Sequence, residues 1–390
     1  MKELPIIRPV LGEEEIVATG EVIASGWITQ GPRTAAFESE FAAFTGAAHA
    51  CAVSNCTVAL HAALLAAGVK PGSEVVTVSH TFIATANAIR YCNAVPVFVD
   101  IEPATFNMDP DRVEAALSPR TSCILAVHQM GMPCDLARLK EIADRNHVPL
   151  VEDAACAIGS RVSVNGEWRP VGAPHGLAAC FSFHPRKLLT TGDGGMITAS
   201  SAECDRTFRL LRQHGMSVSD LARHKSGEVI FESYERVGYN YRLTDLQAAM
   251  GRAQLVKLPL IVERRRELAA RYGQLLAGIE GLVVPTEPSW ARSNWQSYCV
   301  RLPAGIEQKP VMQHLLNLGI HTRRGIMNAH LEPAYAGAEW RAAGSLEHSE
   351  AAQRECVILP MFHEMTEADM ARVAEGLDAA CRAQRGRQTA

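Results

Sequence analysis

Residues 122–156 read SCILAVHQMGMPCDLARLKEIADRNHVPLVEDAAC, and this stretch decides the fold. Its two ends, residues 122–127 and 149–152, are short apolar runs of the kind that form buried strands. Between them, residues 135–146 repeat apolar side chains every three or four positions, which is the spacing of one helix face. The stretch therefore predicts a strand, a crossover helix and a second strand parallel to the first.

The same alternation extends over residues 50–200. Three further strands are expected, at residues 49–53, 74–78 and 95–99. Three further helices are expected, at residues 57–67, 83–91 and 110–117. The pattern indicates an α/β fold with a mainly parallel sheet wrapped by helices.

Beyond Arg242 the pattern changes. One helix is expected at residues 243–255, and a long exposed one, rich in Arg and Glu, at residues 259–276. Weaker signals predict strands at residues 283–285, 296–302 and 321–323 and a closing helix at residues 367–383. We therefore expect a large domain of residues 1–255 and a smaller C-terminal α+β domain of residues 256–390.

The composition argues against nucleic-acid and membrane partners. The 390 residues carry a net charge of -4, which leaves no general basic surface. The N-terminus lacks the charged-then-apolar plan of a signal peptide, which predicts a cytoplasmic protein. Residues 41–69 carry no charge, but Ser54, Asn55 and Thr57 favour a buried strand, turn and helix over a membrane span. The 11 cysteines show no zinc-ligand spacing, so reduced thiols and no metal site are expected.

Two phosphate-binding signatures of α/β proteins are absent from the sequence. GDGG at residues 192–195 lacks the third glycine of the dinucleotide motif, and no G-x-x-x-x-G-K-[ST] is present, so a dehydrogenase or an NTPase loses most of its support. SNCT at residues 54–57 instead joins a predicted strand to an apolar helix, and Thr57 is placed to begin that helix. Free backbone N–H groups there would suit a phosphate, although an ordinary helix cap explains the same residues.

Two further segments place an ionisable side chain at the end of an apolar run. Asp153 ends LVED, where α/β sheets place ligands, and can pair with a cation; a helix cap or a surface ion pair is the alternative. Lys187 follows CFSFHPR, and desolvation there would lower the pKa of its amine and make it a better nucleophile toward an aldehyde. The alternative is a solvated loop lysine beside Arg186.

These segments, together with GWITQGP at residues 26–32, resemble the DegT/StrS family of sugar aminotransferases that depend on pyridoxal 5'-phosphate (PLP). That family belongs to the aspartate-aminotransferase-like, fold type I superfamily, and the resemblance covers nearly the whole chain. It implies that Lys187 is the Schiff-base lysine and that Asp153 pairs with the pyridine nitrogen, which keeps the ring an electron sink. It also implies that Cys56, Thr57 and Ser182 bind the cofactor phosphate.

The resemblance bears on four more residues, Phe82, Asn240, His330 and Cys156. Phe82 would stack on the cofactor ring, and Asn240 would reach the phosphate of the neighbouring subunit's cofactor, which predicts a homodimer with shared active sites. His330 would lie near the sugar. Arg323 and Arg324, just before the His330 motif, carry the charge to meet a sugar pyrophosphate, and a solvated pair of arginines is an equal alternative; this expectation comes from the residues and not from the resemblance. Cys156 departs from the family, which usually carries Gln or His beside the cofactor ring, because cysteine is a weak hydrogen-bond donor.

The expected function is a ping-pong transfer of an amino group from glutamate to a small-molecule keto sugar, most simply a nucleotide-linked keto-deoxy sugar. Lys187 argues against the relatives that dehydrate sugars, in which histidine replaces this lysine. Amination of a keto-cyclitol or of an aromatic-acid precursor stays open, because no residue excludes it. A non-catalytic PLP-binding regulator gains little support from a chain that carries both Lys187 and Asp153.

Overall fold

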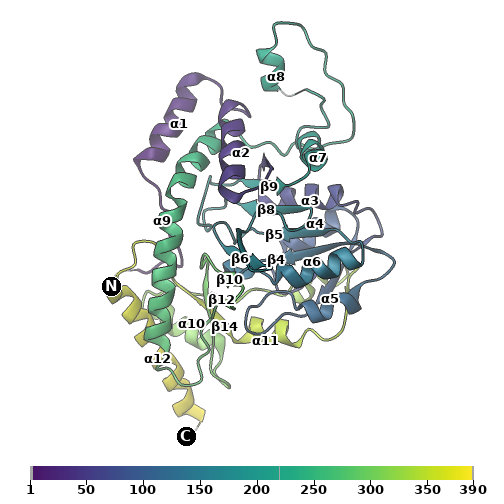
Figure 1. The fold of residues 1–390 in the computed structure, drawn as a ribbon. Helices are drawn as coiled ribbons and strands as arrows, with labels where there is room; N and C mark the ends of the chain where they lie inside the picture. The colour runs from purple at the N-terminus through teal and green to yellow at the C-terminus, as the bar shows by residue number, and fades with distance from the viewer. Residues whose placement is uncertain (1–2, 219, 389–390) are drawn as a thin grey trace.

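The computed structural model describes residues 3–218 and 220–388, and a large sheet forms its centre (Figure 1). In this part of the chain the sheet has eight strands in the order β1-β9-β8-β5-β4-β2-β3-β13. β9 runs antiparallel to both neighbours and the other pairs are parallel, which confirms the expected mainly parallel α/β sheet. The strands are β1 (His49–Val53), β2 (Glu74–Val78), β3 (Val95–Val99), β4 (Thr121–Val127), β5 (Leu150–Asp153), β8 (Ala178–Ser182), β9 (Gly195–Ala199) and β13 (Arg341–Ala342).

Helices cover both faces of this sheet, which explains why its strands are apolar without alternation. In β4, Ile124 and Ala126 belong to one hydrophobic cluster, whereas Cys123 and Leu125 belong to another. Successive side chains of a strand point to opposite faces, so the two clusters lie on opposite sides of the sheet. The covering helices are α3 (Cys56–Ala66), α4 (Ala84–Tyr91), α5 (Pro110–Ala116), α6 (Leu136–Arg145) and α7 (Ala202–Arg212).

Every strand and helix expected between residues 49 and 152 is present, with each bound within one residue of the prediction. The two helices expected at residues 243–255 and 259–276 are instead one helix, α9 (Asp245–Leu276), which continues through Pro259. Proline removes a backbone hydrogen bond from a helix interior. Burial on both sides offsets this loss, because Leu258 packs into one hydrophobic cluster and Leu268 into another.

The remaining elements are two small sheets and several helices. Two small sheets have the orders β10-β6-β7 and β11-β14-β12. The strand expected at residues 283–285 is wrong, since Val283 makes only an isolated bridge to Arg301. The strands of the two small sheets are β6 (Arg161–Val164), β7 (Glu167–Pro170), β10 (Ala291–Arg292), β11 (Tyr298–Arg301), β12 (Arg323–Arg324) and β14 (Cys356–Leu359). The other helices are α1 (Glu13–Ser25), α2 (Pro32–Thr45), α8 (Asp220–Lys225), α10 (Gln308–Asn317), α11 (Glu347–Glu355) and α12 (Glu367–Gln388), with the short η1 (Gln129–Gly131), η2 (Ala329–Leu331) and η3 (Pro333–Tyr335).

The C-terminal part of the chain has its own hydrophobic cluster, which includes Tyr272, Tyr298 and Val357 and also Leu4 from the N-terminal segment. β13, also C-terminal, instead joins the edge of the large sheet. A division after residue 255 would fall inside α9, and it stays a proposal. No helix in the described residues is long and apolar enough to cross a membrane.

Candidate active site

The segments singled out from the sequence meet at one edge of the large sheet. β1 and β8 are each antiparallel to β9, so they run in the same direction as each other and as β5, β4 and β2. Their carboxyl ends therefore lie on one edge, where α/β proteins place ligands. This edge carries residues 54–57 after β1, residues 79–82 after β2, Asp153 at the end of β5 and residues 182–187 after β8.

Asp153 is buried, and its carboxylate accepts hydrogen bonds from two donors. Thr85 Oγ1 lies 2.8 Å from one oxygen, and the Ala155 N–H lies 3.2 Å from the other. Burial raises the pKa of Asp153, although these bonds and the Lys187 cation oppose the rise. Thr81 Oγ1 continues the chain, 2.8 Å from Thr85 Oγ1. Neither threonine was predicted from the sequence, although both lie in the same HTFIAT motif as Phe82.

Lys187 directs its amine at Cys156. The Nζ atom donates a hydrogen bond to Cys156 Sγ over 2.9 Å. The expected lowering of the lysine pKa is wrong: burial lowers it, but Cys156, Cys56 and Asp153 together raise it above its ordinary value. The sequence indicated desolvation alone, because Cys156, Cys56 and Asp153 come from other segments of the fold.

The turn after β1 forms the N-terminus of α3. The helix begins at Cys56, and its cap is Asn55, whose Oδ1 accepts a hydrogen bond from the Val58 N–H at 3.0 Å; the expected start at Thr57 is one residue late. The turn packs tightly against β9, because a Cβ atom on Gly195 would lie 2.6 Å from the Asn55 carbonyl carbon. A helix N-terminus offers backbone N–H groups to an anion, so the chemistry of this turn suits a phosphate.

Two more predicted cofactor residues lie at the same edge. Ser182 is the last residue of β8, and its Oγ accepts a long hydrogen bond from the His184 N–H at 3.4 Å. Phe82 follows β2, and 64% of its surface is exposed. Within the single chain, the Phe82 ring is therefore accessible, and a flat ligand at this edge of the sheet can stack on it.

The segment that carries Asn240 lies against the turn after β1. The Ser54 N–H donates to the Tyr241 carbonyl at 2.9 Å, and His61 Nδ1 lies 3.0 Å from the Tyr241 hydroxyl. Tyr239 stacks on Tyr241 with ring centroids 4.8 Å apart. Asn240 itself is exposed, so its side chain is free to face a second subunit.

His330 and Arg323 differ in how far the protein already engages them. His330 Nδ1 lies 2.6 Å from Ser79 Oγ, and its Nε2 lies 3.4 Å from Glu350 Oε1. Both ring nitrogens thus have protein neighbours, and contact with a sugar stays a prediction. Arg323 is exposed on β12, which pairs with β14 of a small sheet.

The residues at this edge fit pyridoxal 5'-phosphate by their chemistry. The α3 N-terminus and Ser182 offer donors for a phosphate, Asp153 offers a carboxylate for a ring nitrogen, and Lys187 offers an amine for an aldehyde. With the mainly parallel sheet, this set defines a fold type I aminotransferase that depends on PLP.

Comparisons with known proteins agree with that class. Residues 9–378 match the DegT/DnrJ/EryC1/StrS aminotransferase family. The spore coat polysaccharide biosynthesis protein SpsC of Bacillus subtilis is 36% identical over 378 residues, which are 96% of each protein. The chain therefore belongs to the DegT/DnrJ/EryC1/StrS family and is a PLP-dependent aminotransferase.

Two solved structures extend this similarity to three dimensions. The aminotransferase TlmJ from Streptoalloteichus hindustanus is 37% identical with a TM-score of 0.87, covering 98% of this chain and 100% of that chain. DesV of S. venezuelae is 34% identical, also with a TM-score of 0.87, covering 97% of this chain and 99% of that chain. The whole fold, and not only the site motifs, is thus shared with aminotransferases.

Proposed function

We propose that this aminotransferase moves an amino group from glutamate to a nucleotide-linked keto-deoxy sugar. The observation that supports the proposal is that Lys187, buried Asp153 and the N-terminus of α3 all lie where neighbouring strands of the large sheet have their carboxyl ends. The similarity to a spore coat polysaccharide biosynthesis protein supports a sugar acceptor. Arg323 on β12 and His330 are proposed to contact this acceptor.

Each residue has a separate task in this proposal. When bound, PLP supplies the electron-withdrawing ring that amino transfer requires. Asp153 holds the proton of the ring nitrogen, because a buried carboxylate without a water shell favours a cationic partner. The N–H groups at Cys56 and Thr57 bind the phosphate with the Ser182 hydroxyl. Phe82 covers one face of the ring.

Lys187 holds the cofactor and then moves protons. Its amine accepts a proton from the donor carbon as a general base and returns it as a general acid. Cys156 lies 2.9 Å from this amine, so we propose that its sulfur orients the amine in place of the usual Gln or His. Thiols are poor donors but accept from an ammonium group, which is the direction of the observed hydrogen bond.

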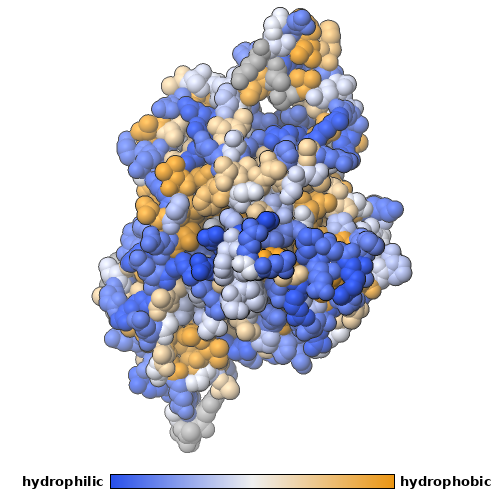
Figure 2. Space-filling view, viewed as in Figure 1, coloured by the Kyte–Doolittle hydropathy of each residue, from blue (hydrophilic) through white to orange (hydrophobic). Residues whose placement is uncertain are grey.

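We further propose that the active enzyme is a homodimer with shared sites. Exposed apolar residues occur on α1 and α9, which pack together, and on the segment before Asn240 (Figure 2). Phe231 is 90% exposed, and Val256 is 81% exposed. A second subunit would cover these surfaces and receive Asn240 at its phosphate.

The first test locates the cofactor. Borohydride reduction of the PLP-loaded protein, followed by peptide mass spectrometry, should find PLP on Lys187. Lys187→Ala should retain no covalent PLP and lose essentially all turnover, whereas Lys140→Ala on α6 serves as the matched control. Trapping of PLP on another lysine, or full turnover by Lys187→Ala, would contradict the assignment.

The second test concerns the substrates. Glutamate should bleach the visible absorption of bound PLP and release one equivalent of 2-oxoglutarate per site. A nucleotide-linked keto-deoxy sugar should then restore the absorption and appear as the amino sugar. Restoration by a keto-cyclitol, with no response to any keto sugar, would contradict the proposed acceptor.

A further inference from the structure

Residues 293–296, here called the bridge, connect the C-terminal part of the chain to the loop that follows β8 and carries Lys187, here called the lysine loop. The bridge follows β10 and precedes β11, whose small sheet also contains β12 with Arg323. All four of its residues are buried. Its position is therefore determined by protein contacts and not by solvent.

Two side chains of the bridge bind backbone carbonyls at or next to the residues in contact, Cys156 and Lys187. Asn294 Nδ2 donates to the Cys156 carbonyl at 2.9 Å and to the Ile158 carbonyl at 2.7 Å. Gln296 Nε2 donates to the Arg186 carbonyl at 2.5 Å, next to Lys187 in the chain. The bridge thus binds the backbone on both sides of the contact between Lys187 Nζ and Cys156 Sγ.

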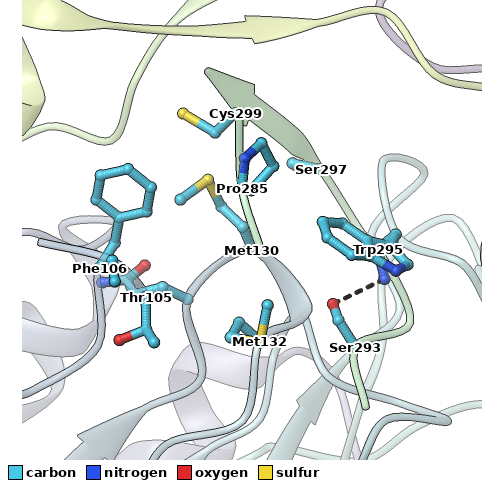
Figure 3. A pocket seen from close by; sticks show the side chains of 11 residues that line it. Thr105, Phe106, Met130, Met132, Pro285, Ser293, Trp295, Ser297 and Cys299 are labelled. Carbon is cyan, nitrogen blue, oxygen red and sulfur yellow. Dashed lines mark hydrogen bonds between the residues drawn. The ribbon is translucent and has the colours of Figure 1, made fainter. Parts of the chain in front are cut away.

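The bridge is itself held in one unusual conformation. Trp295 has a φ of 52°, in the left-handed region that a bulky residue rarely adopts. Its N–H donates to Ser293 Oγ at 2.9 Å, as the dashed line in Figure 3 shows, and its carbonyl accepts from Arg265 Nε at 2.7 Å. Arg265, on α9, also donates to the Gln296 carbonyl at 2.8 Å and is buried. Such strain persists only where surrounding contacts hold it.

The neighbouring loop leaves no room for the bridge to move toward it. A Cβ atom on Gly131 would lie 2.0 Å from Asn294 Oδ1, so only glycine fits there. Asn294 Oδ1 in turn accepts from the Gln296 N–H at 2.8 Å, which couples the two tethering side chains. Figure 3 shows the bridge residues Ser293 and Trp295 beside Met130 and Met132, which flank Gly131 in the chain.

We propose that Asn294 and Gln296 are positioning residues that set the separation between the Lys187 amine and the Cys156 thiol. This inference rests on the proposed role of Lys187, and it adds a link between that amine and the sheet that carries Arg323. Neither residue touches the reacting atoms directly.

The test measures proximity of the two side chains without PLP. Ortho-phthalaldehyde condenses with one amine and one thiol into a fluorescent isoindole and releases two water molecules, so it reports a lysine and a cysteine in contact. In the cofactor-free wild type, mass spectrometry should map this product to Lys187 and Cys156. Gln296→Met, which removes the donor but keeps the volume, should form it at least fivefold more slowly.

Two controls separate positioning from general stability. Gln308→Met is matched, because Gln308 Nε2 also donates to a backbone carbonyl at 2.5 Å, that of Cys356 in the C-terminal part, and should react like the wild type. Gln296→His keeps an N–H donor and should recover most of the rate. In the PLP-loaded protein, Gln296→Met should shift the pH midpoint of the visible absorption, and Gln308→Met should not.

The outcomes decide the inference. A folded Gln296→Met protein with the wild-type isoindole rate and an unchanged midpoint would overturn it. If Gln296→Met does not fold, Gln296→Glu, which keeps the shape and replaces the donor by an acceptor, takes its place with the same expectation. Trapping of PLP on a lysine other than Lys187 would overturn the proposed function instead, and the isoindole rates would still decide the bridge.

Discussion

Asp153 combines burial with few hydrogen-bond donors. Its two oxygens receive one hydroxyl and one N–H, from Thr85 and Ala155. A buried carboxylate is stable as an anion only with enough donors or a cation beside it, and here burial prevails, so its pKa is raised. In the proposed function, the ring nitrogen of PLP would supply the cationic partner that stabilises this carboxylate as an anion.

Asp153→Asn should separate stability from chemistry. Because the pKa of Asp153 is raised in the folded state, the unfolded state releases this proton at a lower pH than the folded state does. Asp153 therefore reduces the free energy of unfolding once the pH exceeds the ordinary pKa of an aspartate. Urea unfolding of the cofactor-free variant should give a free energy equal to the wild type at low pH and higher at neutral pH. In the PLP-loaded enzyme, kcat should fall by about a hundredfold or more. An unchanged kcat would remove Asp153 from its proposed role.

At the scale of elements, α3 joins a structural cap to a ligand site. Asn55 caps the helix, and Gly195 of β9 allows β9 to approach this turn. Because the helix dipole and its free N–H groups favour anions, the turn that stabilises the helix is also the proposed phosphate site. The sequence indicated a helix start within residues 54–57, but neither Asn55 as its cap nor the tight approach of β9 was predicted.

Asn55→Ala and Asn55→Asp should distinguish these two tasks. Alanine removes the hydrogen bond to the Val58 N–H and should lower the free energy of unfolding by about 1 kcal/mol. Aspartate keeps the cap and should leave stability near the wild type, but its charge should repel the phosphate and weaken PLP binding at least about tenfold. Thermal unfolding and PLP titration measure the two effects. Equal PLP affinity in Asn55→Asp and the wild type would place the phosphate elsewhere.

At the scale of the whole molecule, the exposed apolar surface is concentrated on α1, on α9 and before Asn240. Val256 and Leu260 lie one turn apart on α9, with 81% and 67% of their surfaces exposed. Exposed apolar patches of this kind are typical of protein interfaces. This is the surface that the second subunit of the proposed homodimer would cover.

Val256→Arg should weaken the proposed dimer. A charge buried in an apolar interface costs several kcal/mol, so the dissociation constant should rise by roughly two orders of magnitude or more. Sedimentation velocity should show monomers of the variant at concentrations where the wild type is dimeric. At these concentrations the variant should also bind PLP more weakly than the wild type. Leu316→Arg on α10, where leucine is 47% exposed, is the matched control. A wild type that sediments as a monomer would contradict the shared site.

The sequence by itself determined the elements of the large sheet and the motifs at its edge. Strand and helix bounds between residues 49 and 152 follow from periodicities and caps that operate within a few neighbouring residues. Asp153 and Lys187 stood out because each ends an apolar run. The resemblance to a known family then assigned them roles that spacing does not contain.

Only the tertiary structure decided how these residues act on one another. The continuity of α9 through Pro259 depends on two hydrophobic clusters assembled from distant segments. The pKa of Lys187 rises because Cys156, 31 positions away in the chain, meets its amine. Gln296 reaches the lysine loop across 110 positions. Electrostatic and hydrogen-bond partners depend on distances in space, and local sequence patterns encode only the conformation of each segment.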